Sequence, residues 1–251
     1  MPDDYAALLA DLEAEQLETQ AVLRDIEVDE WFRATPAKGW DVRDTIAHLA
    51  DTDEIAVDTC TEGARPLNDF ATTLASPEDV TLWGVLRGRR RSGTDVLAWW
   101  EETSAVERDT LAHLDPATRV PWGLGMRPNS FVTARLMEAW AHSLDVHTAL
   151  GVAKPARDRL RHVAWLGYRA LPYAFSVAGR ERPAGELRVE LTLPSGDRCK
   201  LGPADAPNLV TGPADEFCRL FVHRLTLSEA TALRADGDGA VAALEVARAF
   251  L

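Results

Sequence analysis

Helical spacing of apolar residues is the feature of this sequence that most restricts its fold. The spacing recurs in four long segments before residue 153, and glycine, proline or short polar residues separate these segments. Apolar residues three and four positions apart lie on one face of a helix, which can then pack against neighbouring helices. Four long helices joined by connections of unequal length predict a helical bundle. The predicted helices span residues 4–26, 42–62, 94–114 and 129–150, with a shorter helix from residue 77 and a turn-rich connection over 63–77.

The pattern changes near residue 153, where we expect a second domain to begin. All eight tryptophans lie between Trp31 and Trp165. Residues 186–193 alternate strictly between polar and aliphatic side chains, which is typical of a strand with one buried face. We therefore predict a four-helix bundle in residues 1–153 and a small α+β domain in residues 154–251. The other elements expected in the second domain are strands at 198–201, 208–211 and 232–235 and helices at 156–176, 214–223 and 240–250, the first of them kinked or shortened by Pro172.

Charge and composition limit the classes of partner. The chain has 40 acidic and 27 basic residues and a net charge of −13. This balance argues against a nucleic acid or an anionic membrane surface, both of which attract clustered basic side chains. The first residues are acidic and no apolar run is long enough to span a bilayer, so we expect neither a secretory signal nor a membrane helix. The predicted partner is a small molecule, the predicted oligomeric state is a monomer or homodimer, and the predicted location is the cytoplasm.

Three further groups of charged or reactive residues stand out in the sequence. Cys60, Cys199 and Cys218 are widely spaced, so we expect three reduced thiols rather than a disulfide framework or a cysteine-rich zinc site. The basic run over residues 87–91 either balances nearby acidic side chains or attracts an anionic substrate. The acid-rich surface of the helix over residues 4–26 is expected to face solvent.

The predicted helix 129–150 carries four polar side chains on one side. Arg135, Glu138, His142 and Asp145 follow one another at spacings of three, four and three. One interpretation is a solvent-facing stripe stabilised by pairs one turn apart. The other is a Glu-x-x-x-His pair that points into the bundle and offers two ligands to one metal ion.

His48 in the predicted helix 42–62 is the third candidate ligand. Asp44 and Thr52 share its side of that helix, whereas Ile46 and Leu49 are on the apolar side. Periodicity alone therefore leaves His48 facing solvent, as an ordinary structural histidine. Together with the glutamate and histidine of helix 129–150, however, it completes a set of two histidines and one carboxylate. Catalytic zinc sites with an open fourth position have this composition.

Two segments carry a resemblance to a known family. Residues 39–49 (GWDVRDTIAHL) and 135–142 (RLMEAWAH) are similar to the metal-binding segments of the mycothiol-dependent maleylpyruvate isomerase family, within the wider DinB/YfiT-like group of four-helix bundles. Residues 210–218 (VTGPADEFC) resemble the second, sterol-carrier-like α+β domain of that family. Residues 120–126, with Trp122 and Met126, indicate a particular uncharacterised branch, for which the maleylpyruvate reaction need not hold.

The resemblance implies a divalent metal ion, most simply zinc, held by His48, Glu138 and His142. The implied function is a thiol-dependent transferase or isomerase that uses mycothiol or a similar thiol on a small electrophile. A non-catalytic module with a structural or sensory ion and a metal-assisted hydrolase are the alternatives. Mixed nitrogen and oxygen ligands also suit Ni²⁺, Fe²⁺ and Mn²⁺.

Supporting roles are expected for residues near the ligands and in the second domain. We expect Arg135 to pair with Glu138 and Asp44 to orient His48 through its other ring nitrogen. The family also uses an arginine of the second domain in binding. The candidates for that arginine are Arg219, Arg224 and Arg234.

Overall fold

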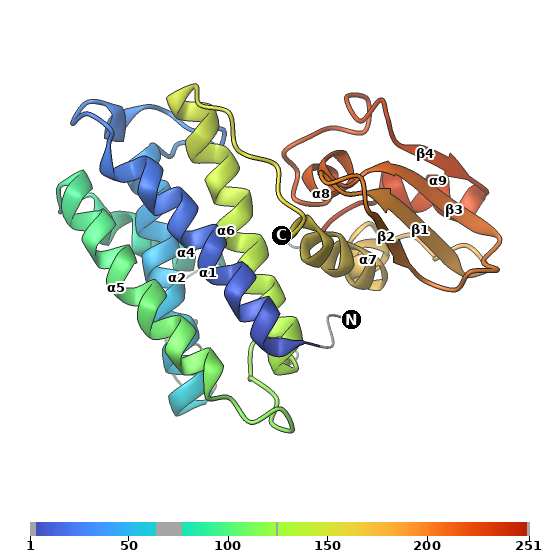
Figure 1. The fold of residues 1–251 in the computed structure, drawn as a ribbon, viewed down its shortest axis with the longest axis horizontal. Helices are drawn as coiled ribbons and strands as arrows, with labels where there is room; N and C mark the ends of the chain where they lie inside the picture. Colours follow the sequence, from blue (N-terminus) through green and yellow to red (C-terminus); the bar gives the residue numbers. More distant parts are fainter. Residues whose placement is uncertain (1–3, 64–76, 124, 250–251) are drawn as a thin grey trace. The chain divides into compact units, whose positions relative to one another are not determined.

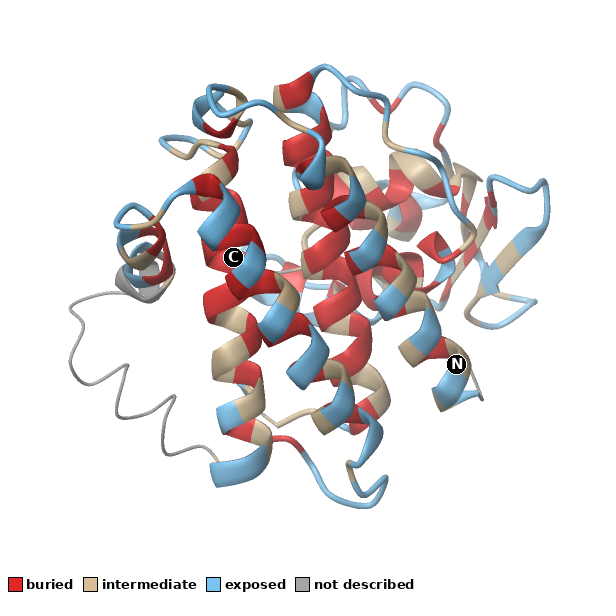
Figure 2. Ribbon diagram, turned by 60° about the vertical axis from the view of Figure 1, so that its left-hand side comes forward, coloured by how far each residue is buried: buried red, intermediate tan, exposed pale blue. Residues whose placement is uncertain are grey.

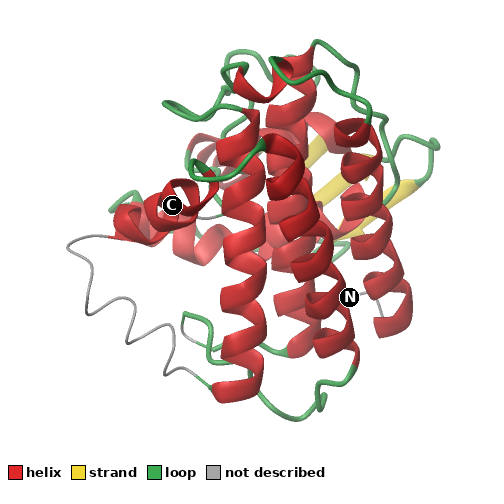
Figure 3. Ribbon diagram, turned by 90° about the vertical axis from the view of Figure 1, so that its left-hand side faces the viewer, coloured by secondary structure: helices red, strands yellow, loops and turns green. Residues whose placement is uncertain are grey.

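The computed structural model describes residues 4–63, 77–123 and 125–249. The chain divides into two compact units, one ending at Lys154 and the other starting at Pro155. Long helices build the first unit, and a small sheet with helices builds the second (Figure 3). The predicted fold class, a helical bundle followed by an α+β part, is therefore confirmed. Among the described residues, no helix has the length and apolar character needed to cross a membrane.

Four long helices form the first unit among the described residues (Figure 1). They are α1 (Tyr5–Arg24), α2 (Val42–Glu62), α5 (Gly93–Ala112) and α6 (Pro128–Leu150), accompanied by the short η1 (Glu30–Phe32) and α4 (Pro77–Gly88). Helix α2 packs against α4, α5 and α6, and α1 packs against α5 and α6. The predicted helices agree with these bounds to within a few residues, and the predicted connection 63–77 lies almost wholly outside the described residues.

The start of α2 is fixed by a reciprocal pair of side-chain hydrogen bonds. The backbone N–H of Asp44 donates to the Asp41 carboxylate at 2.7 Å, and the backbone N–H of Asp41 donates to the Asp44 carboxylate at 3.4 Å. These bonds satisfy two donors that a helix start leaves unpaired. The sequence predicts this start correctly, because Asp41 is a short acceptor placed just before the first helical residue.

The interior of the bundle is apolar at one end of α2 and polar toward its middle. Trp31, Ile46 and Trp100 belong to the apolar cluster, and buried and exposed positions alternate along the helices in Figure 2. Helix α1 differs from its prediction, because Glu15, one of its acidic residues, is buried rather than solvated. Its carboxylate accepts a hydrogen bond from the Lys154 ammonium at 2.5 Å, and this ion pair compensates the loss of water.

The basic run at the end of α4 contacts carboxylates of α2. Arg87 donates to Asp51 and Glu54, both at 2.6 Å, and Arg89 donates to Asp44 at 2.7 Å. The two helices approach closely, since a Cβ atom added to Gly88 would lie 2.2 Å from the Cβ of Ala47. The ion pairs and the close approach favour a structural role for the basic run 87–91 over a role in attracting an anionic substrate.

The second unit contains a mixed sheet in the order β2-β1-β3-β4. Strand β1 pairs antiparallel with β2 and parallel with β3, and β3 pairs antiparallel with β4. Residues Leu187, Val189 and Leu191 of β1 are buried, as the strict alternation predicts. The elements are α7 (Leu160–Val177), β1 (Leu187–Thr192), β2 (Arg198–Leu201), β3 (Asn208–Pro213), α8 (Ala214–Phe221), β4 (Arg234–Asp236) and α9 (Asp238–Glu245).

Helix α7 does not end at its proline. It continues through Pro172 to Val177, so of the two expected effects of the proline, a kink or a shorter helix, the shorter helix is wrong and the kink stays a prediction. Leu171, Ala174 and Phe175 on either side of the proline are buried. Packing of these side chains offsets the hydrogen bond that proline cannot donate.

Candidate metal centre

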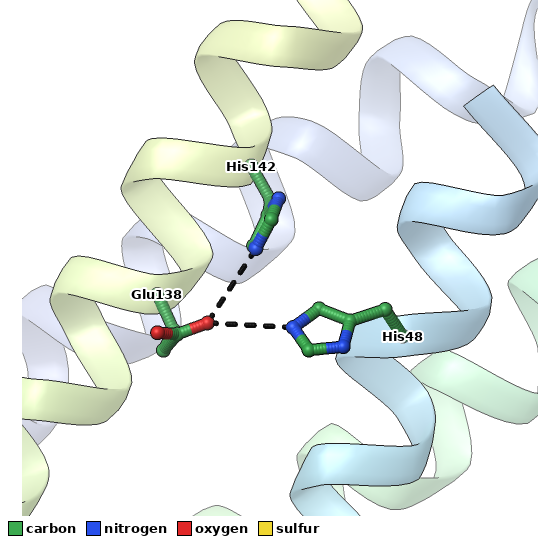
Figure 4. Close-up of side chains that lie close together, drawn as sticks. All are labelled: His48, Glu138 and His142. Carbon is green, nitrogen blue, oxygen red and sulfur yellow. Dashed lines mark ion pairs between the residues drawn. The ribbon is translucent and has the colours of Figure 1, made fainter. Parts of the chain in front are cut away.

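Three candidate ligands converge between α2 and α6. Glu138 and His142 lie one turn apart on α6, so both side chains project from the same face of the helix. His48 points toward them from α2 (Figure 4). One carboxylate oxygen of Glu138, Oε2, lies 3.5 Å from the Nε2 atom of each histidine. One donor atom from each of the three residues lies within 4.8 Å of the other two.

This spacing fits a shared metal ion better than direct hydrogen bonds. A charge-assisted N–H···O bond between imidazole and carboxylate is usually about 2.7–2.9 Å long. Two ligands about 2.1 Å from one tetrahedral ion lie roughly 3.4 Å apart. Both distances of 3.5 Å to the Glu138 oxygen match the second value. Two imidazoles and one carboxylate are also the donor set of catalytic zinc sites, so the residues present fit the ion.

The site is buried on the α2 side and partly exposed on the α6 side. His48 is 6% exposed, which contradicts the expectation from periodicity that it faces solvent, whereas the side chains of His142 and Glu138 are 12% and 22% exposed. The polar side of α2 at this level faces α6, and a helix wheel cannot distinguish a neighbouring polar helix from water. The same explanation applies to Arg135 and Asp145, which are buried instead of forming a solvent stripe.

The three ligands shift one another's protonation. Burial alone would raise the pKa of Glu138, but the neighbouring imidazoles of His142 and His48 hold it well below its usual range. Burial lowers the pKa of His48, and the pairing with Glu138 only partly offsets that effect. Burial also acts to lower the pKa of His142, but hydrogen bonding to Asp145 and Glu138 outweighs it and raises the pKa. The site therefore combines a carboxylate that stays ionised with two imidazoles of different proton affinity.

We predict that zinc affinity falls as the pH is lowered through the raised pKa of His142. A proton on this imidazole competes with the ion for Nε2. Below that pKa the ion must displace one proton, so the zinc affinity falls about tenfold for each pH unit that the pH is lowered. In the metal-free protein the effect of His142 on folding stability has the opposite dependence on pH. A raised folded-state pKa contributes stability at low pH, and this contribution is lost as the pH rises through that pKa. The zinc-induced increase in melting temperature should therefore grow from pH 5.5 to pH 8, and a pH-independent increase would contradict the prediction.

Two residues outside the ligand set contact the imidazoles. The Asp145 carboxylate lies 3.2 Å from Nδ1 of His142, an arrangement in which the Nδ1–H is retained and Nε2 is left free to bind an ion. The indole of Trp40 lies against both imidazoles, with ring centroids 5.0 Å from His48 and 5.9 Å from His142.

The structure does not bring Asp44 and Arg135 to their expected partners. The Asp44 carboxylate accepts hydrogen bonds from Arg89 and from the backbone N–H of Asp41 at the start of α2, so it does not orient His48. The guanidinium of Arg135 donates to Glu107 and Asp53, both at 2.6 Å, instead of pairing with Glu138. Both expectations assign the partner by its place on the same helix, whereas the charged partners that the structure shows, Arg89 for Asp44 and Asp53 and Glu107 for Arg135, lie outside that helix.

The three candidate arginines of the second unit have local partners. Arg219 forms an ion pair with Asp215 at 2.7 Å. Arg224 donates to the backbone carbonyl of Val222, and Arg234 donates to the carbonyls of Thr231 and Leu233. A binding role for any of them stays a prediction.

Four residues around the site carry no predicted role: Asp145, Trp40, Asp53 and Glu107. The helical spacing already places Asp145 on the same face as His142, and the pairing of their side chains follows from that spacing. Trp40 precedes α2 in an irregular segment, where no periodicity relates it to a histidine on the next helix. Asp53 and Glu107 meet their partner Arg135 only through the packing of α2, α5 and α6, so no pattern within one helix relates them.

The fold and the site together define a helical bundle whose interior presents a metal-type donor set, followed by an α+β unit. Comparison with known proteins identifies the family. The profile described as the mycothiol maleylpyruvate isomerase N-terminal domain matches residues 12–147. This chain belongs to the mycothiol-dependent maleylpyruvate isomerase family.

Similar proteins include two from Mycobacterium tuberculosis, the uncharacterized proteins MT0041 of strain CDC 1551 / Oshkosh and Rv0036c of strain H37Rv. Each is 37% identical over 248 residues, which cover 98% of this chain and 96% of the relative. The fold also matches crystal structures of the mycothiol-dependent maleylpyruvate isomerase and of a mutant of it. Both matches have a TM-score of 0.60 and 17% identity, and they cover 91% of each chain. At this identity the structural matches show a shared fold.

Proposed function

We propose that this protein is a zinc-dependent enzyme that uses a low-molecular-weight thiol of the mycothiol type to isomerise a small electrophile or to transfer sulfur to it. The observation that carries the proposal is the convergence of His48, Glu138 and His142 at the spacing of ligands around one ion. Family membership supports the thiol, since the related isomerase is named as mycothiol-dependent.

The charge of the site favours an anionic sulfur ligand. Two neutral imidazoles and the ionised Glu138 contribute one negative charge, so a divalent ion leaves a net charge of +1. Glu138 and the two histidines would hold the ion, and Asp145 keeps the proton on the Nδ1 atom of His142. A zinc ion held by three protein ligands would leave one coordination position open and would supply the charge that acidifies a thiol bound there. The resulting thiolate would add to a conjugated carbon and move the double-bond electrons onto the neighbouring carbonyl oxygen. Rotation about the former double bond, now single, would follow, and return of the electrons from the oxygen would expel the thiolate.

The cysteines of the chain itself do not supply a reactive thiolate. Burial raises the pKa of Cys60 to about 11, with a smaller contribution from the charge of Glu107. Burial also raises the pKa of Cys199 and, more strongly, that of Cys218. At neutral pH all three remain protonated and are poor nucleophiles. An external thiol therefore fits the site better than catalysis by a protein cysteine.

A turnover experiment tests the proposal. The zinc-loaded protein is incubated with mycothiol and maleylpyruvate, and both the thiol and the configuration of the double bond are followed. Isomerisation with recovery of the thiol, or formation of a thiol adduct, supports the proposal if Glu138→Gln abolishes it. His113→Ala is the matched control, since this histidine is 76% exposed and should retain full activity. A zinc-loaded protein that neither binds nor consumes thiol would contradict the proposal, as would hydrolysis that needs no thiol.

A further inference from the structure

The indole of Trp40 forms a compact cluster of rings with the two candidate histidine ligands. It is nearly parallel to the His142 ring, at an interplanar angle of 24°, and tilted by 49° to the His48 ring. The two imidazoles themselves meet edge to face, with centroids 4.8 Å apart. A single side chain from outside α2 and α6 therefore touches both nitrogen ligands, one on each helix.

The backbone around Trp40 is held firmly in place. The N–H of Thr35 donates to the carbonyl of Trp40 at 2.9 Å, and the N–H of Trp40 donates to the carbonyl of Ala37 at 3.0 Å. Gly39 adopts φ = +82°, a left-handed conformation that permits the turn, and its carbonyl accepts a hydrogen bond from Arg89. The indole is thus presented from a closed turn that is tied to α4, rather than from a free loop.

We propose that Trp40 is a positioning residue of the metal centre, which fixes the planes of both imidazoles so that their Nε2 atoms face Glu138. This inference rests on the proposed metal site. An imidazole on a helix can rotate about its Cβ–Cγ bond, and a ligand must lose that freedom when the ion binds. Ring contacts with a fixed indole remove part of the freedom in advance, which lowers the cost of binding. The half-buried indole also excludes water from one side of the rings.

Zinc affinity, measured by competition with a chelating dye, tests the inference without any enzymatic readout. Trp40→Ala should weaken zinc binding about 10–100-fold, the range typical of residues that orient metal ligands. Trp40→Phe retains an aromatic face, so its zinc affinity should fall less than that of Trp40→Ala. The ligand-field spectrum of the Co²⁺-loaded protein should change in both variants, because it reports the arrangement of the ligands. A loss of fold stability alone would leave this spectrum unchanged.

Trp122→Ala is the matched control, since this tryptophan is also half-buried and lies against Phe131, with ring centroids 5.4 Å apart. It should bind zinc as the wild type does. Wild-type zinc affinity and an unchanged Co²⁺ spectrum in Trp40→Ala would overturn the inference while leaving the metal site intact. If Trp40→Ala does not fold, the same two measurements on Trp40→Phe decide the question. A wild-type protein that binds no zinc would overturn the metal site and this inference together.

Discussion

Replacement of His48 by alanine is expected to lower the affinity for zinc by more than about a hundredfold. Loss of a residue that only orients a metal ligand typically weakens metal affinity about 10–100-fold, so the loss of a ligand itself should weaken it more. The remaining Glu138 and His142 lie on one helix and leave the ion two protein ligands. Zinc content after dialysis should fall from about one ion per chain to a trace, and isothermal titration measures the change in affinity.

Two comparisons make this result specific to the site. His113→Ala removes an exposed histidine at the end of α5 and should keep full zinc content. The metal-free stability of His48→Ala is measured beside that of the wild type, because removing a buried side chain costs folding energy independently of zinc. Full zinc content in His48→Ala would place the ion elsewhere in the chain.

Replacement of Arg135 by methionine should destabilise the first unit by about 3–5 kcal/mol, because it leaves two buried carboxylates without their cation. Arg135, Asp53 and Glu107 are each at most 4% exposed, and they join α6, α2 and α5. Burial raises the pKa of Asp53 well above its usual range, and the nearby charge of Glu107 adds to the effect. Urea unfolding measures the loss of stability.

A charge-neutral variant distinguishes this explanation from a simple loss of packing. Combining Arg135→Met with Asp53→Asn and Glu107→Gln removes the unpaired charges while keeping acceptors for Trp100 and Gln16. This triple variant should recover at least half of the lost stability. Arg24→Met is the control: it breaks an exposed ion pair with Glu101 and should lower the free energy of unfolding by less than about 1 kcal/mol. A triple variant as unstable as Arg135→Met alone would contradict the electrostatic explanation.

The parts of the fold that depend on local chemistry could be predicted from the sequence. The cap at Asp41, the strand with Leu187, Val189 and Leu191, and the helix that ends at Leu150 each follow from neighbouring residues. The shared face of Glu138 and His142 follows from helical spacing in the same way. The approach of His48 to these two residues does not follow from spacing, and its prediction came from the resemblance to the family.

Contacts between distant helices explain the predictions that were wrong. A helix wheel separates polar from apolar faces, but it does not show whether a polar face meets water or another polar helix. Glu15 was therefore expected at the surface, and a solvent-facing stripe was one of two interpretations for Arg135 and Asp145; all three residues are buried. The expected partners of Arg135 and Asp44 were wrong for the same reason, since the observed partners of Arg135 come from α2 and α5 and that of Asp44 is Arg89, which follows α4.

Thiol binding to the Co²⁺-loaded protein tests the central claim most directly, because it examines the three ligands and the open coordination position together. We predict that mycothiol produces a sulfur-to-cobalt charge-transfer band that saturates at one thiol per ion. His48→Ala should show neither the bound cobalt nor the band. A cobalt spectrum that saturating thiol leaves unchanged, or a band that persists in His48→Ala, would contradict the account.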